Sequence, residues 1–307
     1  MYNVFQVFQQ KVLDEDKRCC EVYPGSKNLD TLLLVFSQAK ETLKEQNEDI
    51  FKRIDYKLPS EELQEKIRNS EVIFPDADVE GKHVKIFLAA ICDELVKNNK
   101  DFEKPLEHLQ ASVEDFLAEK NDNFSQSQIP VLVEKIVEET LLERDFVTLL
   151  LIFIFSSLYY GPREDFLEEV DTTLWKGNTC PVCGETPHYG FLRGEDRARF
   201  MECWLCGTSW RYPRMKCPYC ETEEQHEMGY FTVDENKVCR VQFCQECKKY
   251  WKIFNWDAYK KYTEEEDALA SMHHLHTLHF DKLALKEGFS PGSGLKWVEE
   301  KDNGLVN

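Results

Sequence analysis

The chain has 307 residues, of which 42% are hydrophobic and 12% are aromatic, so it can bury a sizeable core and form more than one domain. Its 57 acidic residues outnumber its 38 basic residues and give a formal net charge of −19. A field of this sign repels the phosphates of nucleic acid, which argues against a nucleic-acid partner.

The first twenty residues lack the pattern of an export signal. They contain no continuous apolar segment and no twin-arginine pair, and Asp14, Glu15 and Asp16 stand where an apolar segment would end. The sequence therefore predicts a cytoplasmic protein, in which the twelve cysteines serve as metal ligands or thiols and not as disulfides. The longest apolar run, 146–155, is half of the roughly 20 residues that span a bilayer, so we expect a core helix and no membrane insertion.

Up to about residue 170, apolar residues recur at spacings of three and four, which is typical of amphipathic helices. Pro59 and Ser60 indicate the start of one helix, and Pro130 opens another. We expect Gly161 and Pro162 to end the apolar helix, and we predict an all-α domain over 1–170. The clearest apolar stripe comprises Val84, Phe87, Leu88, Ile91 and Leu95.

The composition changes after this helical half. Residues 175–261 are rich in glycine, proline and aromatic residues, have β-prone stretches at 230–233 and 250–254, and carry 14 basic against 12 acidic residues. After Thr263, apolar spacing predicts a last helix that Gly288 ends. The predicted parts are therefore 1–170, 175–261 and a C-terminal helix with a flexible tail over 262–307.

Four C-x-x-C pairs lie between Cys180 and Cys247, and no other motif in the chain is as specific. A two-residue spacing lets one tight turn, or knuckle, direct both sulfurs at one ion, and two knuckles supply the four ligands of a closed tetrahedral site. Pairing in sequence order leaves room for a β-hairpin between the two knuckles of each site; crossed pairing is a less local alternative. The predicted ligands are Cys180, Cys183, Cys203 and Cys206 in one site, and Cys217, Cys220, Cys244 and Cys247 in the other.

Each cysteine module is too small to fold through its core alone. The segments 180–206 and 217–247 both fall below roughly 40 residues, so a metal must contribute folding energy. Gly184 and Gly207 directly follow two knuckles, at a position that favours positive φ. Four sulfurs suit iron and zinc equally, and most such sites are structural. Thiol redox chemistry of the thioredoxin type is a weaker alternative because no βαβ pattern surrounds the pairs.

The residues from Cys180 to Pro187 and from Met201 to Cys220 resemble FdhE, the family of formate dehydrogenase accessory proteins. The resemblance continues through the fourth knuckle at 240–247 and its following aromatic-lysine stretch. It reaches a final helix with Asp281, Gly288 and Phe289, so that it covers the segment 180–289. The segment 1–170 agrees with the family only in being helical and of similar length. One departure is His273-His274, where the family has an Asp-Asp pair.

This resemblance implies an α+β multidomain fold: an all-α N-terminal domain, two small rubredoxin-like or zinc-ribbon-like modules, and a C-terminal helix. It implies two iron ions per chain, with zinc as the alternative. It also implies a cytoplasmic factor that is required for active formate dehydrogenase, binds the catalytic subunit and is not itself an enzyme. The absence of Walker, H-E-x-x-H and G-x-S-x-G motifs from the sequence agrees with this view. The competing classes are a rubredoxin-like electron-transfer protein and a zinc-ribbon nucleic-acid binder.

Aromatic and basic residues alternate between the two cysteine modules, a composition typical of binding hot spots. The plainer interpretation is that the cations offset thiolate charge and pair with surface acids. Cys239 fits a core position as well as a spare thiol, and four histidines near the last helix fit a polar helix face as well as a metal site. The predicted partner-binding residues are Trp204, Trp210, Arg211, Arg214 and Lys216; the four histidines are His273, His274, His276 and His279.

Overall fold

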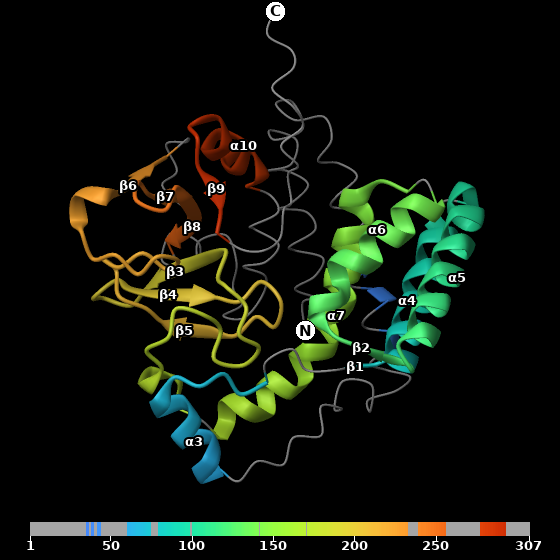
Figure 1. Cartoon of the computed structure of the whole chain (residues 1–307), viewed down its shortest axis with the longest axis horizontal. Coiled ribbons are helices and arrows are strands. Elements are labelled where there is room, and N and C mark those ends of the chain that lie inside the picture. The colour runs from blue at the N-terminus through green and yellow to red at the C-terminus, as the bar shows by residue number, and fades with distance from the viewer. Residues whose placement is uncertain are drawn as a thin grey trace, which may run out of the picture. The chain divides into compact units, whose positions relative to one another are not determined.

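The chain divides into two compact units, each of which is described by itself. The first contains Met1–Leu174 with the turns Pro181–Gly184 and Leu205–Gly207, and the second contains the rest of the chain (Figure 1). The domain limits inferred from the sequence stay predictions. The computed structural model describes residues 35–36, 38–39, 42–43, 60–74, 79–98, 100–140, 142–169, 171–232, 239–255 and 277–292.

The first unit is a set of packed helices. The predicted apolar stripe between Val84 and Leu95 is buried, which confirms the helical interpretation of this segment. α5 packs against α4 and α6, and α7 packs against α4 and α6. A short antiparallel ladder, β1 (Val79–Glu80) with β2 (Asn123–Phe124), accompanies the helices. The helices are α3 (Ser60–Asn69), α4 (Gly81–Asn98), α5 (Glu103–Glu119), α6 (Ile129–Thr140) and α7 (Arg144–Glu169).

The predicted break at Gly161 and Pro162 is wrong, because α7 continues through both residues to Glu169. A proline inside a helix removes one backbone hydrogen bond and costs about 3 kcal/mol. The turns before it are fixed by a stripe of fully buried side chains that includes Leu150, Ile154 and Phe155. Burial therefore outweighs the local preference of the proline. No helix within the described ranges has the length and apolar character that a membrane crossing requires.

The second unit is built on one seven-stranded sheet. Its order is β5-β4-β3-β8-β7-β6, with β9 beside β8. β3, β4 and β5 pair antiparallel, as do β6, β7 and β8, and a parallel pairing of β3 with β8 joins the two groups. The strands are β3 (Tyr189–Arg193), β4 (Ala198–Glu202), β5 (Ser209–Arg211), β6 (Met228–Phe231), β7 (Cys239–Cys244), β8 (Lys249–Asn255) and β9 (Ser290–Pro291).

The mixed fold class predicted from the sequence is confirmed, and the β-prone stretches lie where β6 and β8 form. The joining of both cysteine modules in a single sheet was not predicted. Pairing between β3 and β8 connects segments far apart in the sequence, for example Tyr189 with Lys252. Such a long-range pairing leaves no mark in the local periodicity from which strands are inferred.

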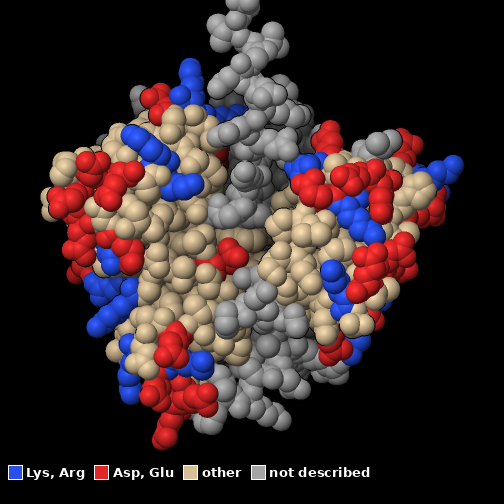
Figure 2. All heavy atoms as spheres, in the orientation of Figure 1, with Lys and Arg blue, Asp and Glu red and all other residues tan. Residues whose placement is uncertain are grey.

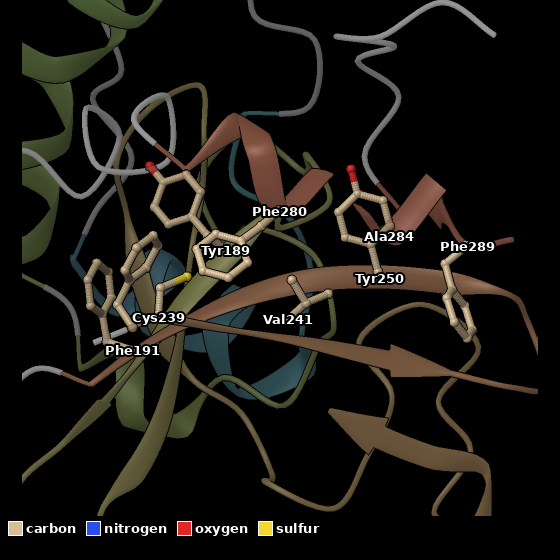
Figure 3. Packing of buried hydrophobic residues seen from close by; sticks show 9 residues of the cluster. Tyr189, Phe191, Cys239, Val241, Tyr250, Phe280, Ala284 and Phe289 are labelled. Atoms are coloured by element: carbon tan, nitrogen blue, oxygen red, sulfur yellow. The ribbon is translucent and has the colours of Figure 1, made fainter. Parts of the chain in front are cut away.

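Helix α10 (Leu278–Lys286) covers one face of this sheet. Phe280 and Ala284 of the helix pack with Tyr189, Phe191 and Val241 of the strands in one hydrophobic cluster (Figure 3). The predicted helix end is confirmed, since Gly288 has a φ of +84° and its N–H donates to the Leu285 carbonyl oxygen. His273, His274 and His276 lie outside the described residues, and His279 falls in the first turn of α10.

A buried ion pair fixes α10 to the centre of the sheet. Lys252 Nζ of β8 lies 2.5 Å from Asp281 Oδ2 of α10, and both side chains are at most 3% exposed. Tyr250 Oη donates to Asp281 Oδ1 at 2.8 Å, and Lys252 Nζ also donates to the Thr277 carbonyl oxygen at 3.3 Å. Burial lowers the pKa of Lys252, although Asp281 opposes the shift. The ammonium is thus held in the core by oxygen atoms from one helix end.

We expect Asp281→Asn to lower the stability of the sheet unit by about 3–5 kcal/mol, because it leaves the buried Lys252 ammonium without its counter-charge. The double variant Lys252→Met, Asp281→Leu removes both charges and should recover most of that loss. Denaturant unfolding followed by tryptophan fluorescence measures both effects. A double variant that is as unstable as the single one would show that the ion pair is not the cause.

Candidate metal centres

The eight cysteines of the C-x-x-C pairs lie in four turns that repeat the same order twice. Cys180 and Cys183 precede β3, and Cys203 and Cys206 stand between β4 and β5. The second module repeats this order: one pair before β6, and the other, Cys244 and Cys247, at the β7–β8 connection. Each module therefore runs knuckle, two strands, knuckle, strand.

A shared backbone geometry aims the two sulfurs of each pair in the same direction. In three of the knuckles the N–H of the first cysteine donates to the carbonyl oxygen five residues later, at 2.8–2.9 Å. Cys217 Sγ also accepts a hydrogen bond from the Tyr219 N–H at 3.4 Å, as expected of a sulfur that carries negative charge. The three closing bonds run from Cys180 to Glu185, Cys203 to Thr208 and Cys217 to Thr222.

The residue after the second cysteine has positive φ in all four knuckles. This was predicted for Gly184 and Gly207, whose φ values are +79° and +69°. The second module places Glu221 (+61°) and Lys248 (+55°) in the same conformation. This conformation costs a residue with a Cβ roughly 1–2 kcal/mol. The second module therefore adopts its ligand geometry although two of its residues have an unfavourable backbone conformation.

The sulfur positions match a four-coordinate metal. Within each group of four cysteines, all sulfurs lie within 4.8 Å of one another. The sulfur pairs Cys183–Cys206, Cys217–Cys247 and Cys220–Cys244 are each 3.7 Å apart. A disulfide requires about 2.05 Å, whereas a tetrahedron with bonds of about 2.3 Å has edges of about 3.8 Å. The two groups form from pairs in sequence order, and the donor set suits iron and zinc alike.

The two centres differ in their exposure to solvent. All four cysteines of the first group are buried, whereas Cys220 and Cys247 of the second group reach the solvent. Burial raises the pKa of Cys217 well above the ordinary range and that of Cys247 to about 11. Because a metal binds thiolates, loading this site must release protons and must become easier as the pH rises.

The first knuckle is held by the segment after α3. Within the first unit, the N–H groups of Ile73 and Phe74 donate to the carbonyl oxygens of Pro181 and Val182 at 3.0 and 2.8 Å. A Cβ added at Gly184 would lie 3.3 Å from Val72 Cγ1. The first knuckle is thus held by backbone hydrogen bonds from Ile73 and Phe74 as well as through its cysteine sulfurs.

Arg199 fixes the loop that leads into the second centre. Its buried guanidinium donates to the carbonyl oxygens of Pro213 and Lys216, immediately before Cys217, and to Gln242 Oε1 at 3.4 Å. It also lies over the rings of Tyr212 and Trp251 at 5.1 and 5.7 Å. Burial lowers its pKa to about 10, while ionised Tyr212 and Cys217 would oppose that shift. Arg199 lies on β4 and Gln242 on β7, so one cation connects the two modules.

The predicted partner-binding strip needs one correction. Trp210 is fully buried in the sheet, because β5 turns its side chain inward, and it offers no surface to a partner. Trp204 is half-buried and its Nε1–H donates to Glu185 at 3.3 Å. Arg211 is exposed and paired with Asp196 at 3.2 Å. Lys216 pairs with Glu221 at 2.8 Å, and Arg214 is exposed. A recognition role for these four residues stays a prediction.

The cysteines outside the knuckles are explained by packing where they are described. Cys239 is a buried member of the cluster under α10, as expected of a core residue. Cys92 is buried in α4, where burial raises its pKa to about 12. Cys19 and Cys20 lie outside the described residues.

Fold and site together define a class of protein: packed helices followed by a sheet that carries two tandem four-cysteine centres. In a comparison with known proteins, residues 179–214 match the model of the FdhE central domain. The resemblance to FdhE predicted from the sequence is confirmed. The matched segment contains the whole first centre.

Curated relatives match part of the chain, and a solved structure shares its fold. An FdhE homolog of Aquifex aeolicus is 37% identical over 84 residues, which is 26% of this chain and 30% of that protein. One from Pseudomonas aeruginosa is 32% identical over 119 residues, 36% of either chain. The chain thus spans about a third of the length of the curated relatives it matches. The crystal structure of FdhE from Pseudomonas aeruginosa shares the fold over 98% of this chain and 97% of that one, with a TM-score of 0.60 and 18% identity.

We expect Gly184→Ala to weaken the first centre by about 1–2 kcal/mol, because alanine must adopt a φ near +79° and its Cβ meets Val72. The matched control is Glu221→Ala, which already has a Cβ at the same knuckle position and loses only an exposed ion pair, worth about 0–1 kcal/mol. Metal retention during denaturant titration compares the variants. Equal losses in both would contradict the role assigned to backbone conformation.

We also expect a chelator to remove metal from the second centre before the first, because only the second has ligands that reach the solvent. Alkylation during partial chelation, followed by peptide mass mapping, should label Cys220 and Cys247 earlier than Cys180 and Cys203. Metal analysis of protein prepared without chelator gives the starting content, for which we expect two ions. Simultaneous labelling of both groups would argue against independent centres.

Proposed function

We propose that this protein is an accessory factor required for active formate dehydrogenase and that it binds the catalytic subunit of that enzyme in the cytoplasm. The observation that carries the proposal is the FdhE central domain at 179–214, supported by the fold shared with an FdhE protein along nearly the whole chain. Both four-cysteine clusters are the proposed metal sites, with iron as the metal and zinc as the alternative. Visible absorption of protein prepared without oxygen distinguishes the two metals.

The proposed role is binding and not catalysis. Four thiolates fill the coordination shell of a metal, so a closed centre leaves no position for a substrate. When bound, the metals supply folding energy and, in the case of iron, a one-electron couple. The residues of the chain hold the shape: Arg199 fixes the loop before Cys217, and the Lys252–Asp281 pair fixes α10. The resulting sheet unit offers a formed surface to a partly folded enzyme subunit.

A second candidate function is electron transfer of the rubredoxin type. The observation that favours it is the exposure of Cys220 and Cys247, because electron transfer to another protein requires a centre close to the surface. The first centre, with four buried cysteines, does not share this feature. The two candidates differ in whether the metal must change its oxidation state.

We expect the tagged protein to co-purify with the catalytic subunit of formate dehydrogenase, and cells that lack the protein to lose formate dehydrogenase activity. Cys217→Ser with Cys220→Ser should abolish both, because serine cannot replace a thiolate as a soft ligand and the second module loses its metal. Cys239→Ala, in the same sheet but outside the centres, is the matched control and should retain association.

Substitution of the metal separates the two candidates. Protein loaded with zinc alone should still bind the subunit and restore activity if the role is accessory, because zinc maintains the shape without a redox change. Restoration by iron protein only would favour electron transfer. Undiminished activity in cells without the protein would overturn the accessory role.

A further inference from the structure

Three further arginines lie near the buried Arg199, on the side of the sheet where Arg199 binds the loop that leads into Cys217. Arg214 follows Pro213, whose carbonyl oxygen accepts a hydrogen bond from Arg199. Arg240 lies two residues before Gln242 on β7, and Gln242 Oε1 accepts from Arg199. Alternate residues of a strand share a face, so Arg240 and Gln242 lie on the same side of the sheet. Arg197 ends the β3–β4 turn, two residues before Arg199.

Three other cations of the region have carboxylate partners. Arg211 pairs with Asp196, Arg193 with Glu202 and Lys216 with Glu221. For Arg197, Arg214 and Arg240 the described part of the chain contains no ion-pair partner. The Nε of Arg240 is buried and has no hydrogen-bond partner among the described residues. Glu202, Asp196 and Glu221 are therefore engaged by other cations.

Tyr230 completes this surface. It lies on β6 with 62% of its surface exposed, and the Arg240 guanidinium stacks over its ring at 4.9 Å from the centroid. Stacking fixes the plane of the guanidinium and reduces the entropy lost when a ligand binds. Burial, the positive charge of Arg214 and, to a smaller extent, that of Arg197 lower the pKa of Arg240, although Tyr230 opposes them, so the three cations influence one another. Figure 2 shows basic side chains gathered at the left edge of the sheet unit, beside a group of acidic ones.

We propose that Arg197, Arg214, Arg240 and Tyr230 form an arginine surface that binds an acidic segment of a partner protein. A guanidinium can take a carboxylate through two parallel hydrogen bonds, and arginine with tyrosine is the usual composition of binding hot spots. Bound carboxylates would also relieve the repulsion among the three cations. As an account of how the formate dehydrogenase subunit is recognised, this inference rests on the proposed function.

Charge favours a short acidic protein segment over nucleic acid. The chain as a whole carries −19, so a long polyphosphate meets repulsion along most of its length. A segment with a few carboxylates can contact the arginine surface while the rest of its protein is neutral or basic. Long-range repulsion then costs little, and local attraction decides the affinity.

Binding of a labelled synthetic peptide that alternates glutamate and serine tests the inference, with the peptide that has glutamine in place of glutamate as the reference. By fluorescence anisotropy at low salt, we expect the metal-loaded full chain to bind the glutamate peptide at least about tenfold more tightly than the glutamine peptide. Arg197→Glu with Arg214→Glu should remove this preference. Because both side chains are exposed, metal content and the unfolding midpoint should stay unchanged.

The control variant is Arg68→Glu with Lys104→Glu, which makes the same change in net charge at exposed positions of α3 and α5. It should bind the peptide like the parent protein. Arg240→Gln, which keeps a polar side chain over Tyr230, should weaken binding to an intermediate degree. Equal loss in the control and in the arginine variant would reduce the effect to net charge and overturn the inference. Tighter binding of single-stranded DNA than of the glutamate peptide would overturn it in favour of nucleic acid.

Association with the formate dehydrogenase subunit is measured separately. If the arginine variant associates as strongly as the parent while the Cys217→Ser, Cys220→Ser variant does not, the arginine surface is not the recognition site and the proposed function stands. If the parent protein binds the glutamate peptide but not the subunit, the proposed function fails and the arginine surface stands with another acidic partner.

Discussion

The close approach of four sulfur atoms, twice in one sheet, is the constraint on which the second unit depends. Sulfurs 3.7 Å apart repel one another as thiolates, and burial opposes their ionisation, so the geometry is stable only when a cation binds them. The knuckle turns, their left-handed residues and the hairpins between them all serve this arrangement. Glu221 and Lys248 show its strength, because ordinary residues adopt positive φ there.

Among the described residues, each face of the sheet contains a fully buried cation. On the α10 side, Lys252 is neutralised by Asp281. On the opposite side, the hydrogen bonds of Arg199 within the described residues go to neutral oxygen atoms. The first arrangement fixes a helix by a complete ion pair. The second leaves a positive charge beside the loop that leads into Cys217, where a metal with four thiolates would carry net negative charge. Burying an unmatched charge is costly, so the Arg199 side is complete only with a loaded centre.

The sequence predicts what is local and periodic. The stripe from Val84 to Leu95, the cysteine spacing and the glycines after two knuckles each leave a signal within a few residues, and the structure contains them. Prediction from the sequence fails where contacts between distant segments determine the structure. Helix α7 continues through Pro162 because the turns before it are buried, the side chain of Trp210 points into the core, and β3 pairs with β8. The burial of Arg199 and Lys252 was not predicted, because a basic residue within a strand looks exposed until the covering loop or helix is placed. Lys252 stands among aromatic residues, which could have indicated burial.

The parallel joint between β3 and β8 has a consequence for self-association. In the knuckle, two strands, knuckle, strand order, β3 corresponds to β6 and β8 corresponds to β5, so the modules meet head to tail and not about a twofold axis. In the described part of the chain, the sheet therefore ends in β5 on one side and β6 on the other. Because β5 corresponds to β8 and β6 to β3, these two edges are equivalent to the two strands that pair at the joint. A head-to-tail contact of this kind does not close on itself, and repeated between chains it would grow a filament. β5 is only three residues long, and short edge strands are a common protection against such growth. Lengthening β5 would remove that protection.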